Sequence, residues 1–336
     1  MPHSLTQLLD AKGVLLADGA TGTNLFEVGL EAGEAPEMWL ESHPDRITAL
    51  HQAFVDNGAD IILSCSFGAN RHRLKLHQAE GRTHALNRIA AELARAVADA
   101  AGRPVVVGGS VGPTGELLQP LGALSYAEAV EAFREQIAGL KDGGVDVVWI
   151  ETMSAGEEVR AAAEAALACD MPYVVTGSFD SAGRTMMGIH PCDFHKAVDG
   201  LSRRPVAVGA NCGVGASDML ATALELETGS PDSALVVKAN CGIPRFVDGG
   251  TVYSGTPDQM ADYARLAIDA GARIIGGCCG TSPQHLGAMR QAIDSHVRRQ
   301  RPSIAEIVEA VGPLVNKAAS AAGETAPRTG RRRSRD

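Results

Sequence analysis

The sequence contains no long apolar run. A helix that crosses a bilayer needs about 18 or more consecutive apolar residues, and no such stretch occurs among the 336 residues. The first residues, "MPHSLTQLLDAKG", also lack the basic region and apolar region of a secretion signal. We therefore expect a cytoplasmic protein without a membrane partner.

Negative charge outweighs positive charge over most of the chain, with 40 Asp and Glu against 30 Lys and Arg in all. The formal net charge is −10, although Arg328–Asp336 alone holds five arginines. An acidic body argues against nucleic acid as a partner. The basic residues follow the low-complexity stretch "AASAAGETAP", so we expect the tail over 319–336 to be disordered.

Nucleotide-binding motifs are missing as well. No G-x-G-x-x-G follows the first predicted strand, and no G-x-x-x-x-G-K-[ST] occurs anywhere in the chain, so the usual signals of a nucleotide-binding open sheet are absent. The seven cysteines are an odd number in a chain without a secretion signal. Metal binding or catalysis is therefore favoured over a disulfide framework.

What the sequence does contain is a repeated pattern: a short β-branched run, a glycine-rich loop and an alanine-rich amphipathic segment. Eight such runs alternate with helices, which favours a single (β/α)8 TIM barrel, with a doubly wound open sheet as the alternative. The predicted strands are 13–18, 60–64, 104–110, 146–151, 172–179, 205–211, 234–240 and 273–277, and the predicted helices are 82–102, 126–144, 155–170, 216–229, 256–271 and 282–297.

No domain boundary is evident before the tail. The barrel is predicted to occupy residues 1–300, and an extension follows over 301–318. This extension, "RPSIAEIVEAVGPL", is a candidate oligomerisation arm, which makes the protein a candidate homo-oligomer.

Three cysteines fall at strand ends, where the chemistry of a barrel enzyme resides. Cys212 follows the sixth predicted strand, and Cys278 and Cys279 follow the eighth. In a barrel, the seventh strand separates the sixth from the eighth, so the backbones of these two strands lie roughly 9–10 Å apart. Inward-pointing side chains from both strands can therefore converge on one ion. Three thiolates are a strong ligand set for Zn²⁺, with a fourth position open to solvent or substrate. We predict a zinc site at the carboxyl-terminal face of the barrel.

Other interpretations of the cysteines stay open. The adjacent pair could form a strained vicinal disulfide, or the zinc could be purely structural. Cys241 follows the seventh predicted strand in a second "ANCG" motif, and as a ligand it would close the site with a fourth thiolate. We expect Cys65, Cys169 and Cys192 to be buried structural residues.

Two carboxylates also stand at strand ends, Asp18 in "DGATG" and Glu151 after "DVVWI". A buried ionised carboxylate needs a cationic partner or hydrogen bonds, and a substrate ammonium group would supply one. The alternative is a structural role, which for Asp18 is a turn cap. Trp39, in the long loop after the first strand, is a candidate to hold a quaternary ammonium group by cation–π attraction, or else packs against the barrel rim.

Several motifs together resemble the zinc-dependent homocysteine S-methyltransferases: "LADGATGTNL", "GADIILSCSFGANRHRL", "GGSVGPTGE", "WIETMS", "VGANCGVG", "ANCGIP" and "IIGGCCGTSPQHL". The resemblance covers about residues 10 to 300, and the combination of "NC" with "GGCCGT" is its most specific part. The chain looks closest to bacterial betaine–homocysteine S-methyltransferases, and it is also similar to the homocysteine-binding module of cobalamin-dependent methionine synthase.

The resemblance implies an enzyme that transfers a methyl group to the thiol of homocysteine and forms methionine, with Zn²⁺ as cofactor and glycine betaine as donor. Asp18 and Glu151 fall on family positions that contact the homocysteine amino group, and Ser64 occupies a position next to the substrate. The zinc ligands that it implies are Cys212, Cys278 and Cys279.

Two positions depart from the family pattern. Thr152 stands where animal betaine enzymes have Tyr, and Cys241 stands where many relatives have Ala. The first leaves S-methylmethionine and a methylcorrinoid protein or methylcobalamin open as donors, and the second leaves the ligand count open. A non-enzymatic metal-binding or redox protein is the alternative of another class.

Overall fold

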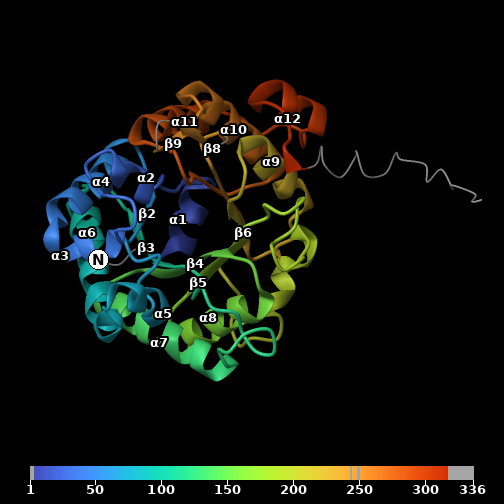
Figure 1. Ribbon diagram of the computed structural model, residues 1–336. Coiled ribbons are helices and arrows are strands. Elements are labelled where there is room, and N and C mark those ends of the chain that lie inside the picture. Colours follow the sequence, from blue (N-terminus) through green and yellow to red (C-terminus); the bar gives the residue numbers. More distant parts are fainter. Residues whose placement is uncertain (1–3, 243, 248–249, 317–336) are drawn as a thin grey trace, which may run out of the picture.

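The structure is a computed structural model that describes residues 4–242, 244–247 and 250–316. Over these residues, eight parallel strands form a barrel that helices surround on the outside (Figure 1). The strand order is β1-β10-β7-β6-β5-β4-β3-β2, and a parallel bridge between Ala17 and Ile61 joins its two ends. The predicted (β/α)8 barrel is thus confirmed. The strands are β1 (Leu15–Leu16), β2 (Ile61–Leu63), β3 (Val106–Val111), β4 (Val147–Met153), β5 (Tyr173–Gly177), β6 (Ala207–Cys212), β7 (Ala234–Ala239) and β10 (Ile274–Gly277).

The predicted outer helices are present as well. They are α6 (Thr83–Ala100), α7 (Tyr126–Asp142), α8 (Gly156–Ala168), α9 (Ala216–Glu225), α10 (Pro257–Ala270) and α11 (Pro283–Ser295). Local chemistry sets their ends. Ser125 and Glu128 form a capping box at the start of α7, while Thr256 caps the start of α10 and Gly271 ends it in the left-handed conformation.

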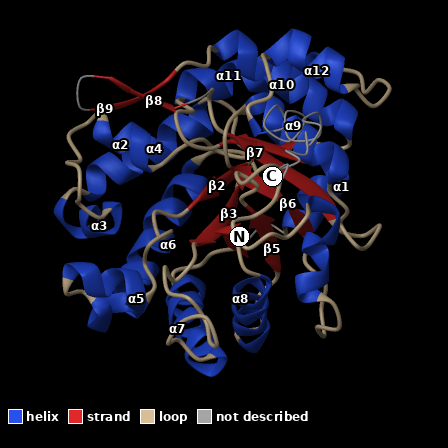
Figure 2. Ribbon diagram, turned by 45° about the vertical axis from the view of Figure 1, so that its right-hand side comes forward, coloured by secondary structure: helices blue, strands red, loops and turns tan. Residues whose placement is uncertain are grey.

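Other elements interrupt the repeat, and the sequence pattern did not reveal them. The long loop expected after the first strand is mostly helical, and a 3-10 helix that begins at Pro191 replaces an α-helix between β5 and β6. An antiparallel hairpin follows β7 and lies outside the barrel (Figure 2). Most of these elements are too short for a periodic pattern to show. They are α2 (Gly22–Phe26), η1 (Pro36–Met38), α3 (Trp39–Ser42), α4 (Pro44–Asp56), α5 (Arg71–Leu74), η2 (Lys75–His77), η3 (Glu80–Arg82), η4 (Pro191–Val198), β8 (Pro244–Val247) and β9 (Gly250–Tyr253).

A short amino-terminal helix, α1 (Leu5–Lys12), closes one end of the barrel. Leu5, Leu8 and Leu9 are buried and share one apolar cluster with inward-facing strand residues such as Ile61 and Val147. Figure 1 shows this helix near the centre of the ring. Because β1 follows α1 directly, the helix lies at the amino-terminal end of the strands and leaves their carboxyl ends open for a site.

Shortening one of these leucines should weaken the fold. Leu9 is 3% exposed, and we expect Leu9→Ala to lower the free energy of unfolding by about 2–5 kcal/mol, because it leaves a cavity at the end of the barrel core. Urea unfolding followed by circular dichroism measures the change. Gln7→Ala, on the exposed side of the same helix, should shift stability by no more than about 0.5 kcal/mol. Equal losses in both variants would contradict the role of α1 as a barrel plug.

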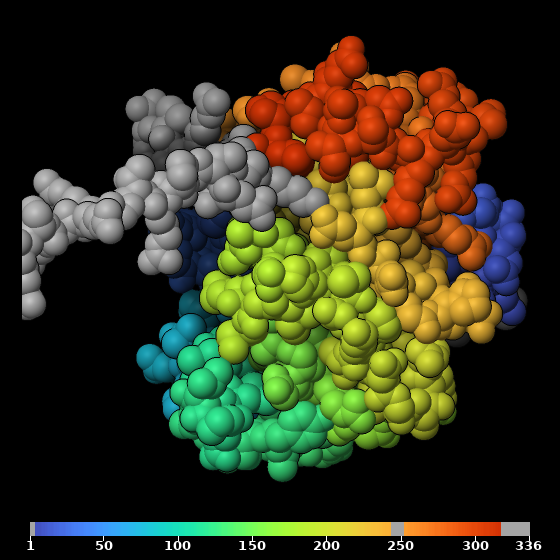
Figure 3. Space-filling model, turned by 90° about the vertical axis from the view of Figure 1, so that its right-hand side faces the viewer, coloured from blue at the N-terminus to red at the C-terminus, as the bar shows by residue number. Residues whose placement is uncertain are grey.

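The carboxyl-terminal extension packs on its own barrel. Its helix α12 (Ile304–Val311) buries Ile307 and Val311 and contacts α9 and α10, and Figure 3 shows this red segment against the rest of the surface. Asp218 in α9 accepts hydrogen bonds from the amides of Val315 and Asn316. The apolar face of α12 is therefore used within the chain, while its role as an oligomerisation arm stays a prediction. Residues 317–336, which include the basic tail, lie outside the described residues.

Among the helices in the described part of the chain, none combines the length and apolar character needed to cross a membrane.

Candidate active site

Three cysteine side chains converge at the carboxyl ends of the strands. The sulfur atoms of Cys212, Cys278 and Cys279 all lie within 4.8 Å of one another, and Cys212 Sγ is 4.0 Å from Cys279 Sγ. A tetrahedral ion with thiolates at about 2.3 Å holds them about 3.8 Å apart. The three thiols therefore fit one metal ion after only small movements, and their partial exposure leaves the site accessible.

The sheet register brings the three cysteines together. β7 lies between β6 and β10, and its Ala239 pairs with Cys212 on one side and with Gly277 on the other. The Cys278 amide donates to the Ala239 carbonyl over 2.7 Å. Cys212 itself has a φ of 64°, a left-handed conformation that is uncommon for residues other than glycine and clusters at functional sites.

The glycines around the cysteine pair are required by close contacts. A Cβ at Gly277 would lie 2.2 Å from the Thr281 side chain, and a Cβ at Gly280 would lie 2.3 Å from the Tyr253 ring. Gly280 also has a φ of 80°, which glycine adopts without strain. The Thr281 amide donates to the Cys278 carbonyl and closes the turn. The "GGCCGT" motif thus encodes a tight turn that presents two adjacent thiols.

Asn211 connects the strand of Glu151 to the cysteines. Its Oδ1 accepts from the Thr152 amide, and its Nδ2 donates to Thr152 Oγ1, each over 2.7 Å. Thr152 has a φ of 62°, a strained conformation for a β-branched residue, so these bonds stabilise the bulge after Glu151. Asn211 Nδ2 also lies 3.9 Å from Cys278 Sγ, a contact of the kind that orients metal ligands.

Glu151 ends up buried beside the cysteine site. It is 8% exposed, and Ser110 Oγ donates to its Oε1 over 2.5 Å. Burial raises the pKa of Glu151, while the charge of Lys238 and the bond from Ser110 oppose that rise. Within the described residues, no hydrogen-bond donor reaches the second oxygen, Oε2. This carboxylate can therefore take a cationic group of a ligand.

Asp18 already has a cation of the protein as its partner. This cation is Lys238, which was not predicted from the sequence. Lys238 Nζ donates to Asp18 Oδ1 and the Leu63 amide donates to Oδ2, both over 2.7 Å. Burial lowers the pKa of Lys238, but the charges of Asp18 and Glu151 outweigh it and raise that pKa. Lys238 thus stays protonated. A lysine within the apolar strand "ALVVKAN" was the available signal, since charged residues are almost never buried without a partner.

The side chains of Ser64 and Trp39 contact other residues and not the three cysteines. The Ser64 hydroxyl is 2.7 Å from the Ser66 hydroxyl and accepts from the Ser110 amide, so it supports the residue that holds Glu151. Trp39 is 4% exposed, and its ring faces Arg46, whose guanidinium carbon is 4.9 Å from the ring centroid. The structure does not place Trp39 among the side chains of the cysteine site.

The remaining cysteines do not join the cluster. Among the described residues, the only three-cysteine group with metal-binding spacing excludes Cys241, which is 1% exposed and whose sulfur packs against Gly255. Burial raises the pKa of its thiol to about 11. Cys65 is buried as expected and Cys169 is half-buried, but Cys192 is exposed on η4, so the prediction of burial is wrong for that residue.

Tyr253 is a further neighbour that the sequence analysis did not identify. It belongs to the hairpin strand β9, and its side chain covers Gly280, directly after Cys279 in the chain. Burial and the nearby cysteines raise its pKa, so the phenol is neutral. No pattern marked this residue, because the hairpin itself was not predicted.

The fold and the site together define a (β/α)8-barrel protein with three thiols at its mouth that could hold one metal ion, and with a buried carboxylate next to them. The chain belongs to the homocysteine S-methyltransferase family, whose model matches residues 15–293.

Relatives of known identity agree with this assignment. The metallated form of the homocysteine methyltransferase MmuM from Escherichia coli is similar in structure, with a TM-score of 0.72 and 27% identity over 85% of this chain and 98% of that chain. Methionine synthase from Mycobacterium tuberculosis is 28% identical over 91% of this chain, and the Mycobacterium leprae enzyme is 28% identical over 86% of it. The chain spans about a quarter of the length of these two synthases, 27% and 25% respectively.

Proposed function

We propose that the protein transfers a methyl group to the thiol of homocysteine and forms methionine, with Zn²⁺ held by Cys212, Cys278 and Cys279. The observation that carries this proposal is the convergence of three thiols within 4.8 Å beside a buried carboxylate with an available oxygen. Membership of the family and similarity to a metallated homocysteine methyltransferase support it.

The donor set favours zinc over harder ions. Three thiolates are soft ligands, and zinc accepts them in a tetrahedral arrangement that leaves one position for a substrate. Mg²⁺ and Ca²⁺ instead require oxygen ligands. When bound, zinc lowers the pKa of a thiol that coordinates it and so supplies a thiolate nucleophile at neutral pH.

Glu151 would bind and orient the substrate. Its Oε2 is available to the ammonium group of homocysteine, while Ser110 holds Oε1. A buried pair of this kind fixes the amino acid end of the substrate, so that its thiol reaches the cysteines at the neighbouring strand ends. Asp18 contributes negative charge from the floor of the site, with its position set by Lys238 and the Leu63 amide.

Glycine betaine is the donor that we propose, with S-methylmethionine and a methylcorrinoid protein as the competing donors. The homocysteine sulfur attacks the methyl carbon, the new S–CH₃ bond forms as the N–CH₃ bond breaks, and the electron pair stays on nitrogen. The products are methionine and a neutral tertiary amine. The Trp39 ring already faces Arg46, so we propose that the donor cation relies on the negative charge of the site instead.

A panel of donors tests the proposal. The zinc-loaded full chain is incubated with homocysteine and, separately, with glycine betaine, S-methylmethionine or methylcobalamin, and methionine is measured by mass spectrometry. We expect methionine from glycine betaine and its loss after zinc is removed by a chelator. Methionine from another donor alone would change the donor but keep the reaction. If no donor yields methionine while zinc remains bound, the chain is a metal-binding protein and the proposal fails.

A further inference from the structure

A cavity lies at the end of the barrel opposite the cysteines. It has a volume of about 720 Å³, within the range of small-molecule sites. Segments that precede β1, β2, β3 and β10 line it together with the carboxyl-terminal ends of α10 and α11. It therefore belongs to the amino-terminal face of the barrel and is separate from the active site.

This cavity is basic, although the protein as a whole is acidic. Five lysine or arginine side chains line it against two aspartates, whereas the whole chain has a formal charge of −10. The cavity lining thus has a formal surplus of positive charge on a negative molecule, which favours an anionic ligand. The five are Lys12, Arg103, Arg273, Arg290 and Arg298.

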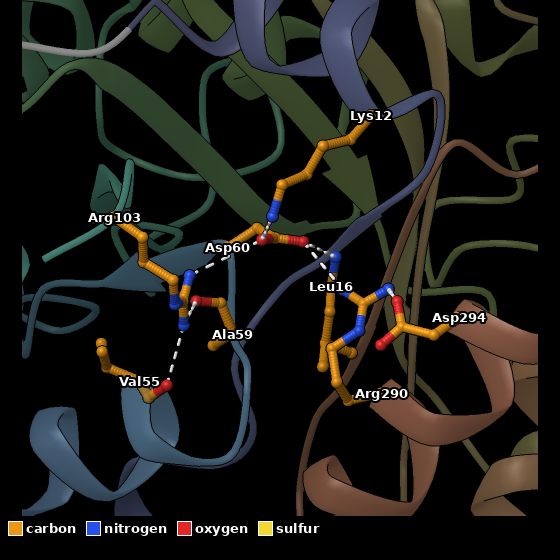
Figure 4. Close-up of polar contacts among 8 residues, drawn as sticks. All are labelled: Lys12, Leu16, Val55, Ala59, Asp60, Arg103, Arg290 and Asp294. Atoms are coloured by element: carbon orange, nitrogen blue, oxygen red, sulfur yellow. Dashed lines mark hydrogen bonds and ion pairs between the residues drawn. The ribbon is translucent and has the colours of Figure 1, made fainter. Parts of the chain in front are cut away.

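Asp60 cannot neutralise the cations that surround it. It is 1% exposed, and Lys12 Nζ, Arg290 Nη1 and Arg103 Nη1 lie 2.5, 3.0 and 3.7 Å from its oxygens (Figure 4). Three positive charges thus share one carboxylate. Asp294 adds a second carboxylate, 2.5 Å from Arg290 Nη2. The group formed by these five residues still has a surplus of positive charge.

Structural contacts account for most of these cations. Arg103 donates to the carbonyls of Val55 and Ala59 (Figure 4), while Lys12 and Arg290 pair with the aspartates. Arg273 donates to the carbonyls of Leu9 and Gly13 at the end of α1, so it serves as a helix cap. Arg298 is exposed, and within the described residues it has no hydrogen-bond or ion-pair partner. A guanidinium that lines a cavity without a partner is available to a ligand.

One wall of the cavity is apolar. It is formed by Val14, Ile268, Ala272 and Ile293; Val14 is half-buried, and only small parts of the other three side chains are accessible, since they are at most 8% exposed. A bare inorganic ion would not use this wall or fill the volume. A ligand with a multiply charged end and a planar or apolar end matches both sides.

We propose that this cavity binds a phosphorylated small molecule of the nucleoside phosphate type, with the phosphates on the basic side chains and the remainder against the apolar wall. Guanidinium groups bind phosphate oxygens in pairs. A polyphosphate carries several negative charges, and these match a surplus of positive charge that is spread over several side chains of the cavity.

Isothermal titration calorimetry at low salt, with the full chain, tests this proposal. The probes are ATP, pyrophosphate, adenosine and citrate. We expect ATP to bind more tightly than pyrophosphate, citrate to bind at least about tenfold more weakly than ATP, and adenosine alone not to bind. Binding of ATP should weaken as salt is raised. No binding of ATP at millimolar concentration, or citrate binding as tightly as ATP, would overturn the proposal.

A matched pair of variants locates the site. Arg298→Glu should weaken ATP binding by about tenfold or more, while Arg299→Glu makes the same change of charge one residue away, outside the cavity lining, and should have a smaller effect. Both side chains are exposed, so the fold should be kept, as circular dichroism would show. Equal affinity of Arg298→Glu and the wild type for ATP would overturn the assignment.

Discussion

Replacing Cys279 with serine is expected to remove bound zinc and to lower kcat/KM for methionine formation by about 10³-fold or more. The reason is that Cys279 supplies one of three thiols that meet within 4.8 Å, and loss of a metal-activated nucleophile removes several kcal/mol of transition-state stabilisation. Zinc content by inductively coupled plasma mass spectrometry and methionine formation are measured on the same preparations.

Cys241→Ser is the matched control for this experiment. Cys241 lies in the same kind of "ANCG" motif as Cys212 and its amide bonds to the Cys279 carbonyl, but its sulfur packs against Gly255 outside the cluster. This variant should retain zinc and most of the activity. The three-thiol site would be refuted if Cys279→Ser kept a full equivalent of zinc, or if Cys241→Ser lost it to the same extent.

The second large effect is expected for Glu151→Gln. This variant keeps the shape of the side chain but removes the charge that we assign to the substrate ammonium group. We expect kcat/KM for homocysteine to fall by about 10²-fold or more, as for other buried charge pairs that lose one partner, with zinc content unchanged. For 4-sulfanylbutanoate, an analogue of homocysteine without the amino group, we expect kcat/KM to differ little between the wild type and the variant.

Glu158→Gln controls for the general effect of neutralising a buried carboxylate. Glu158 is 6% exposed and accepts from the Thr114 amide and hydroxyl, away from the cysteines. Its replacement should lower stability but leave the preference for homocysteine over the analogue unchanged. If Glu151→Gln reduced both substrates equally, Glu151 would act on the fold or the metal centre and not on the ammonium group.

The lysine beneath the site changes how its charge is understood. From the sequence alone, Asp18 and Glu151 were either two carboxylates that a substrate cation could pair with or residues with structural roles. In the structure, Lys238 pairs with Asp18 and its charge also acts on Glu151. One net negative charge is therefore left for a monocationic ligand, and Glu151 is the carboxylate with an oxygen to spare.

The fold was largely predictable because its pattern is local. Strands that are buried on both faces are continuous apolar runs, and every residue of β3 is indeed buried. Helices such as α7 and α10 carry their own start and stop residues. The plug helix α1, the 3-10 helix η4 and the β8–β9 hairpin were not predicted, because short elements depend on what they pack against more than on their own periodicity.

The amino-acid sequence was enough to predict the alternation of strands and helices and the positions of Cys212, Cys278 and Cys279 at strand ends. It also contains the glycines that allow the turn around the last two cysteines. Three contacts became visible only in the folded chain: the three thiols meet while Cys241 stays apart, Lys238 pairs with Asp18, and Trp39 faces Arg46. Burial, charge pairing and ring contacts join residues that are far apart in the chain, such as Asp18 and Lys238 at 220 positions, and neither spacing nor composition records the distance between such residues after folding.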